Sequence, residues 1–277
     1  MQKLKLTLIA LSIFIIAGSC TNPKQAKEAE TTSAKENTNE NDIPEALNDL
    51  TKAHNNRAFN KKEVITFDMA LFFRGNLRLD ATITATTNST KVLVSKKNGE
   101  HLLYENGEVY ISPDTANTEG ARFDALTWSY FALAPFKFKD TGTHWKENAA
   151  LPLDSTAQQQ PTLKLTFGNE VGDAPDDWYI IYQYPESNLL KAMAYIVTFG
   201  NKTQETAEQN PHAIVYDDYQ TIDDIKIASK WSFHDWNSTD GLGKQLGSAT
   251  ISNIKFTNYA DDLFALADKK LVPLNSK

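Results

Sequence analysis

The segment 64–87 reads VITFDMALFFRGNLRLDATITATT, and its apolar residues alternate with polar ones on both sides of Arg74-Gly75. Alternation with a period of two is typical of a strand that buries one face. A short turn containing glycine between two such runs predicts an antiparallel hairpin. We therefore expect strands at 64–73 and 76–87, joined by a tight turn.

The same pattern recurs along most of the chain. The segment HLLYENGEVYIS (101–112) contains Asn106-Gly107, a pair that suits a two-residue type I′ turn. Asp223-Asp224 separates two further alternating runs in the same way. Besides the opening hairpin and the 101–112 hairpin, strands are expected at 90–97, 162–168, 178–184, 191–199, 213–222, 225–236 and 249–256.

Three segments predict helices. Residues 43–56 carry an amphipathic pattern, and 260–268 could form a short helix near the end of the chain. GARFDALTWSYFALAPF (120–136) is apolar on nearly all sides, which indicates a buried helix, and Pro135 is expected to end it. Because strands and helices do not alternate, a parallel sheet is disfavoured. We expect an α+β, mainly β fold: one large curved antiparallel sheet of about ten strands, an unclosed half-barrel with helices on its concave side.

The first twenty residues predict export. Lys3 and Lys5 precede an apolar run that is too short to span a bilayer as a helix, as in a signal peptide over 1–19. Ala17-Gly18-Ser19-Cys20 resembles the lipobox of bacterial lipoproteins, and Cys20 is the only cysteine of the chain. The resemblance implies that Cys20 carries lipid and anchors the protein to a membrane, with Thr21 favouring the periplasmic face of the outer membrane.

The remainder divides into two parts. Residues 20–42 lack large apolar side chains and predict a disordered tether, followed by a single β-rich domain over 43–277. The net charge is −7, and it becomes −9 without the first twenty residues, which contain two lysines and no acidic residue. An acidic domain without a basic stripe disfavours nucleic-acid binding.

Aromatic side chains are the most informative candidates for function. If they gather on the inner face of the sheet and on the helix beneath it, they either fill a packed core or line a ligand cavity. The candidates for such a cavity are Trp128, Tyr130, Phe131, Trp178, Tyr182, Tyr195, Phe199, Trp231 and Phe233.

Evidence for catalysis or metal binding is weak. No two of the five histidines have a metal-ligand spacing such as H-x-x-x-H, and no calcium loop, nucleophile elbow or phosphate loop is present. His234 and Asp235 are adjacent in an expected strand, so they point to opposite faces. We expect no cofactor and no metal site. A hydrolase that uses Asp217, Asp218 or His234 remains an alternative.

The order of elements resembles the lipoprotein carrier and receptor superfamily of the LolA/LolB type. The likeness is carried by DDWYIIYQYPESNLLKAMAYIVTF (176–199), by IKIASKWSFHDW (225–236) and by ATISNIKF (249–256). The resemblance implies an unclosed barrel plugged by helices and a non-enzymatic protein. We hypothesise a periplasm-facing lipoprotein that binds an apolar ligand, a lipid or an acyl chain, in a sheet-lined cavity. The alternative outside catalysis is an envelope scaffold with a filled core that binds a protein partner.

Overall fold

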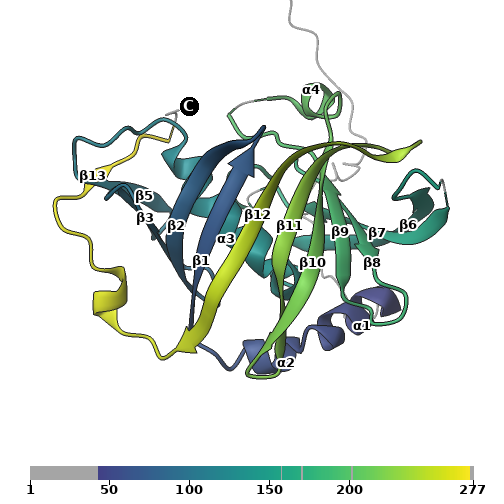
Figure 1. Cartoon of the computed structure of the whole chain (residues 1–277), viewed down its shortest axis with the longest axis horizontal. Coiled ribbons are helices and arrows are strands. Elements are labelled where there is room, and N and C mark those ends of the chain that lie inside the picture. Colours follow the sequence, from purple (N-terminus) through teal and green to yellow (C-terminus); the bar gives the residue numbers. More distant parts are fainter. Residues whose placement is uncertain (1–42, 157, 170, 201, 275–277) are drawn as a thin grey trace, which may run out of the picture. The chain divides into compact units, whose positions relative to one another are not determined.

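The computed structural model describes residues 43–274 except 157, 170 and 201, and these residues form one thirteen-stranded sheet with helices against it (Figure 1). The expected signal peptide, Cys20 and the expected tether lie outside the described residues. The strands are β1 Val64–Phe73, β2 Asn76–Thr86, β3 Lys91–Lys96, β4 His101–Glu105, β5 Glu108–Ser112, β6 Thr143–Pro152, β7 Gln159–Phe167, β8 Tyr179–Gln183, β9 Leu190–Tyr195, β10 His212–Ile222, β11 Ile225–Asn237, β12 Gly241–Thr257 and β13 Lys270–Leu271.

The strand order is β13-β5-β4-β3-β2-β1-β12-β11-β10-β9-β8-β7-β6, and every neighbouring pair is antiparallel. The two edge strands, β13 and β6, lie on opposite sides of the view in Figure 1. The expected class is therefore confirmed: mainly β, antiparallel, curved and unclosed. The strand count is thirteen rather than about ten.

The hairpin turns form where the sequence predicts them. Both central residues have positive φ in Arg74-Gly75 (50° and 80°), Asn106-Gly107 (53° and 81°) and Asp223-Asp224 (51° and 64°). Such turns match the twist of the flanking strands, and Asn, Asp and Gly adopt positive φ most readily. These turns set the registers β1–β2, β4–β5 and β10–β11.

The helices are α1 Glu45–Ala53, α2 Asn56–Phe59, α3 Ala121–Lys137 and α4 Gln204–Ala207. Helix α3 lies across the concave face and contacts β3, β4, β5 and β11, as well as α1 and α2. The single helix expected over 43–56 is divided because Asn55 has a left-handed φ of 59° and caps α2.

Helix α3 continues past Pro135 to Lys137, so the expectation that this proline ends it is wrong. Proline cannot donate a hydrogen bond to the carbonyl four residues earlier, which belongs to Phe131. The hydroxyl of Tyr216 on β10 donates to that oxygen instead, at 3.1 Å. The helix therefore tolerates the proline because another element replaces the missing bond.

Several element boundaries also differ from expectation. Strand β6 was not expected, since THWKENAALP shows little apolar alternation and its residues are mostly half-buried or exposed. Strand β12 begins at Gly241, well before 249, and β9 ends at Tyr195, before Phe199. The terminal helix expected over 260–268 is a short 3₁₀ turn, Asp261–Phe264. The short elements α4 and β13 were not expected.

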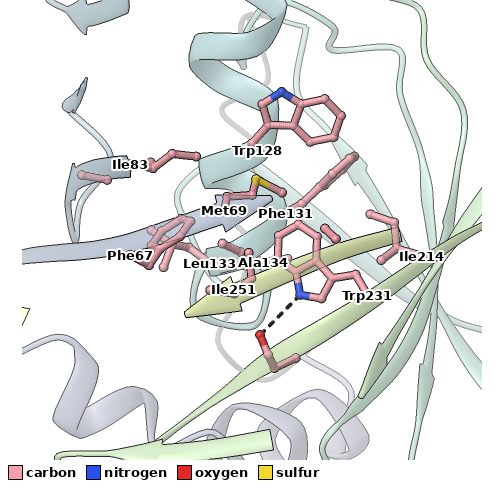
Figure 2. Close-up of a cluster of buried hydrophobic side chains, with 14 of the residues drawn as sticks. Phe67, Met69, Ile83, Trp128, Phe131, Leu133, Ala134, Ile214, Trp231 and Ile251 are labelled. Atoms are coloured by element: carbon pink, nitrogen blue, oxygen red, sulfur yellow. Dashed lines mark hydrogen bonds between the residues drawn. The ribbon is translucent and has the colours of Figure 1, made fainter. Parts of the chain in front are cut away.

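The core has two main layers. The larger one fills the space between the concave face and helices α1 to α3. Figure 2 shows side chains of α3, among them Trp128, Phe131 and Leu133, facing residues of β1, β2 and β12. A second cluster covers the opposite face of β8 to β11, where Leu153 and Ala207 of α4 pack against strand residues such as Tyr182 and Trp236.

Candidate functional site

A pocket of about 510 Å³ lies between α3 and the concave face of the sheet. The first half of α3 forms one wall, and residues of β1 to β4, of β7 to β12 and of the segment 171–177 form the others. Aromatic and aliphatic side chains predominate in the lining. The residues that line it include Phe73, Val92, Tyr104, Phe123, Leu126, Trp128, Tyr130, Phe131, Phe167, Val171, Tyr179, Tyr195, Val197, Phe199, Phe233 and Leu246.

Six of the nine aromatic residues proposed from sequence line this pocket: Trp128, Tyr130, Phe131, Tyr195, Phe199 and Phe233. The structure brings them together from α3, β9, β11 and the turn after β9. Their part in binding stays a prediction, but their common location follows from the fold.

The other three lie elsewhere. Trp231 packs in the main core, with its ring centroid 5.6 Å from that of Tyr216, and its indole N–H points at the Ala228 carbonyl 3.4 Å away (Figure 2). Trp178 and Tyr182 belong to the second cluster on the opposite face of the sheet, so their expected place on the inner face is wrong. Tyr179 and Ile181 take the inner positions of β8.

The physical reason lies in the burial of β8. Tyr179, Ile180, Ile181 and Tyr182 are all buried, because α3 covers one face and α4 with Leu153 and Trp236 covers the other. In WYIIYQY both sets of alternate residues are apolar, so periodicity alone cannot distinguish the two faces. Sequence reasoning consequently missed Tyr179 as a pocket residue.

The aromatic wall is continuous. The ring of Trp128 lies 5.8 Å from Phe123, 6.3 Å from Phe131 and 6.2 Å from Phe233, measured between centroids. Phe123 in turn lies 5.6 Å from Phe199. Edge-to-face contacts of this kind are typical of well-packed aromatic groups. They give one side of the pocket a mainly apolar surface.

Charged residues hold the first turns of α3 in place. Arg78 of β2 donates to both oxygens of Asp124, at 2.7 and 3.1 Å, and the indole N–H of Trp128 donates to the same carboxylate at 2.9 Å. Arg122 pairs with Asp173 and also donates to the Gly107 carbonyl at 3.1 Å. Sequence reasoning did not single out Arg122 or Asp124, although two charges near the start of a largely apolar helix were a usable signal.

Polar groups gather at another part of the wall. Tyr130, Tyr179 and Tyr195 lie side by side, and the Asp177 carboxylate lies close by. Burial raises the pKa of Asp177 to about 6, although the N–H and hydroxyl of Thr198 donate to it at 2.7 and 2.9 Å. Burial also lowers the pKa of His212, whose ring is 6.1 Å from that of Tyr195.

The residues considered for hydrolysis lie outside the pocket lining. Asp218 forms an ion pair with Lys230 at 2.9 Å on the exposed surface, and His234 contacts the Ser232 hydroxyl at 2.9 Å. His234 pairs with Ala213 along β10, four positions from Asp217. Within residues 43–274, as far as described, no group of three His, Cys, Asp or Glu side chains is arranged to hold a metal ion.

The comparisons with known proteins bear on the fold. No family model matches the chain, and no curated protein matches it by sequence. A solved LolA superfamily protein from Nitrosomonas europaea superposes with a TM-score of 0.50 at 9% identity, covering 80% of this chain and 96% of the other. The chain has a LolA-like fold.

Two further structures resemble this LolA-like fold less closely. A DUF1329 family protein from Desulfovibrio piger gives a TM-score of 0.47 at 10% identity, over 79% of this chain and 95% of that one. A domain described as that of an outer membrane lipoprotein-sorting protein, from Vibrio parahaemolyticus, gives 0.41 at 9% identity, over 79% and 97%. The superposition on the Nitrosomonas europaea protein confirms the expected resemblance at the level of the fold. No helix among the described residues has the length and apolar character to cross a membrane.

Proposed function

We propose that this LolA-like protein binds an apolar ligand, a lipid or an acyl chain, in the pocket between α3 and the sheet. The observation that supports the proposal is the pocket itself: about 510 Å³ walled by Phe123, Trp128, Phe199, Phe233 and their neighbours. Small-molecule pockets commonly enclose about 300–1,000 Å³ and are mostly apolar. A scaffold with a filled core would not need such a space.

The energetics suit a hydrocarbon chain. Each buried methylene group contributes about 0.8 kcal/mol, so an acyl chain of about ten methylenes gains about 8 kcal/mol before the entropic losses of binding. The aromatic side of the pocket can supply this binding free energy without forming hydrogen bonds to the ligand. Binding of this kind is non-enzymatic, and it accepts ligands that differ in chain length.

The cellular setting in this proposal rests on the sequence. Lipid on Cys20 anchors the protein to the outer membrane, the segment 20–42 acts as a tether, and the binding domain faces the periplasm. We expect incorporation of a labelled palmitate analogue into the chain in cells, and loss of both label and membrane association in the Cys20→Ala variant. A labelled Cys20→Ala protein would contradict the anchor.

A pocket-filling substitution tests the binding site. Thr127 of α3 lines the pocket, and Thr127→Trp should occupy part of its volume. Thr250→Trp adds the same side chain at an exposed position of β12 and serves as the matched control. After removal of bound lipid, the wild-type chain should bind N-phenyl-1-naphthylamine saturably, and laurate should displace it.

The two variants should then differ. Thr127→Trp is expected to weaken probe binding at least about tenfold, since a loss of 1.4 kcal/mol is sufficient for that change. Thr250→Trp should bind like the wild type. Absence of saturable binding by the wild-type chain, or equal binding by both variants, would reject the pocket as the site.

A further inference from the structure

Three tyrosines from three different elements form one polar area of the pocket wall. Tyr130 is on α3, Tyr179 on β8 and Tyr195 on β9, and all three line the pocket. The ring centroids of Tyr130 and Tyr179 are 5.9 Å apart, and those of Tyr179 and Tyr195 are 6.2 Å apart. We call these three residues the tyrosine cluster.

The hydroxyl groups of the tyrosine cluster have no hydrogen-bond partners among the described residues. The Tyr130 hydroxyl is fully buried and unpaired. Tyr179 and Tyr195 are only 6% and 8% exposed, and neither hydroxyl forms a hydrogen bond with another described residue. A fully buried hydroxyl without a partner, as at Tyr130, costs about 1–3 kcal/mol, so such groups are rare in a finished core.

Nearby tyrosines show that this fold otherwise satisfies its phenols. The hydroxyls of Tyr182, Tyr184, Tyr216 and Tyr219 each donate to a backbone carbonyl, those of Pro152, Tyr216, Phe131 and Leu190, at 2.5 to 3.2 Å. All four lie outside the pocket lining. Among these seven tyrosines, the unpaired hydroxyls are therefore confined to the three whose residues line the pocket, where a ligand could accept their hydrogen bonds.

A carboxylate limits the charge of such a ligand. Asp177 lines the same region and accepts two hydrogen bonds from Thr198 through one oxygen, Oδ1. Its charge and the neighbouring phenols both act on Tyr179, whose pKa is raised mainly by burial. An anionic head group would meet this carboxylate in a poorly solvated place, where like charges repel strongly. A neutral head group avoids the repulsion.

We propose that the tyrosine cluster binds the uncharged head group of an acyl lipid, in which an ester carbonyl accepts hydrogen bonds from the phenols and a hydroxyl donates to Asp177. The inference rests on the proposed function, because it assigns the head group of the ligand whose chain fills the aromatic side of the pocket. Monoacylglycerols have this chemistry, whereas fatty acids carry a charge and alkanes have no polar group.

Three ligands with the same twelve-carbon chain separate the head-group contribution from that of the chain. The full chain, freed of bound lipid, is loaded with N-phenyl-1-naphthylamine at about pH 8, where Asp177 is ionised since its pKa is about 6. Monolaurin, laurate and dodecane then compete for the site. We expect monolaurin to bind at least about threefold more tightly than either of the others, the effect of roughly one net hydrogen bond.

Variants that each lack one phenol oxygen show which tyrosines contribute to binding of the head group. Tyr130→Phe and Tyr179→Phe should each weaken monolaurin binding by about threefold to tenfold and leave dodecane binding unchanged. Tyr219→Phe is the matched control, because its hydroxyl is also buried but donates to Leu190 outside the pocket. It should leave the affinity for all three ligands unchanged.

Thermal stability provides a second test, because the two kinds of tyrosine variant should change the melting temperature in opposite directions. Without ligand, Tyr130→Phe removes an unsatisfied buried hydroxyl and should raise the melting temperature, whereas Tyr219→Phe removes a satisfied one and should lower it. Saturable binding of all three ligands with equal affinity, unaffected by the tyrosine variants, would overturn this inference and leave lipid binding intact. Failure of all three ligands to bind would reject the proposed function and the inference together.

Discussion

The Tyr216 hydroxyl donates a hydrogen bond to the Phe131 carbonyl, 3.1 Å away, at the position where Pro135 leaves α3 without its own donor. One side chain of β10 thus completes the backbone hydrogen bonding of a buried helix. The same contact fixes α3 against the sheet next to the pocket, since Phe131 is part of the pocket wall.

Removal of this hydroxyl should cost more stability while Pro135 is present than in its absence. Tyr216→Phe leaves a buried carbonyl unpaired and should lower the free energy of unfolding by about 1–3 kcal/mol. In a Pro135→Ala background the helix supplies its own N–H, so the same substitution should cost about 1 kcal/mol less. Urea unfolding of the four proteins of this cycle measures the difference, and strictly additive effects would contradict the explanation.

The Asp124 carboxylate joins β2 to α3. It is 4% exposed and accepts hydrogen bonds from Arg78 and from the Trp128 indole. Asp124→Asn keeps the shape but loses the charge, and we expect a loss of about 1.5–3 kcal/mol in unfolding free energy. Asp80→Asn, at an exposed position of β2, should change the stability by less than about 0.5 kcal/mol. Equal effects of the two substitutions would show that the buried contacts contribute little.

Asp177 should make the fold less stable as the pH rises. Burial raises its pKa from 3.8 to about 6, so the folded state binds the proton more tightly than the unfolded state does. This contribution is favourable below about pH 4 and is lost progressively up to about pH 6, a change of roughly 3 kcal/mol. Asp177→Asn should therefore gain stability relative to wild type over this range, as measured by urea unfolding at each pH. If the free energy of unfolding has the same pH dependence in Asp177→Asn and in the wild type, this prediction is refuted.

His54 should have the opposite pH dependence. Its Nε2 accepts from the Leu190 N–H at 3.0 Å and its Nδ1 lies 2.9 Å from the Lys226 carbonyl, an arrangement that requires the neutral ring. Burial lowers the pKa from 6.5 to about 4. Stability present above about pH 6.5 is lost as the pH falls to about 4, by roughly 3 kcal/mol. His54→Gln should abolish this loss. The NMR titration of the His54 ring provides a direct check, and a midpoint near the usual value would disprove the assignment.

Gly241 permits a close approach between the start of β12 and the end of β6. A Cβ atom there would lie 2.6 Å from the Leu153 carbonyl carbon and oxygen, and the residue has a φ of 78°. Gly241→Ala should destabilise the fold by more than Gly99→Ala, where φ is 90° but nothing lies within 4 Å of the added atom. Gly99→Ala measures only the free-energy cost of a positive φ for a residue with a Cβ atom, about 1–2 kcal/mol. A thermal unfolding comparison that finds the two variants equal would exclude the steric explanation.

Local patterns were sufficient for most of the sheet. Turn pairs such as Asn106-Gly107 and the alternation in β1, β2 and β11 depend on a few neighbouring residues, so most strands and the antiparallel character of the sheet could be predicted. The same holds for the burial of α3, whose apolar residues surround the helix. Failures occurred where the local pattern was ambiguous or absent, as in β6 and on the two faces of β8.

Periodicity and turn chemistry act over short distances, so they were enough to predict a mainly β fold with one apolar helix against an antiparallel sheet. The folded arrangement was needed to show that Tyr179 rather than Trp178 faces inward, that Tyr216 completes α3 at Pro135, and that an open pocket remains beside Trp128. These features depend on which surfaces cover each face of a strand and on how closely distant side chains fill the space between them.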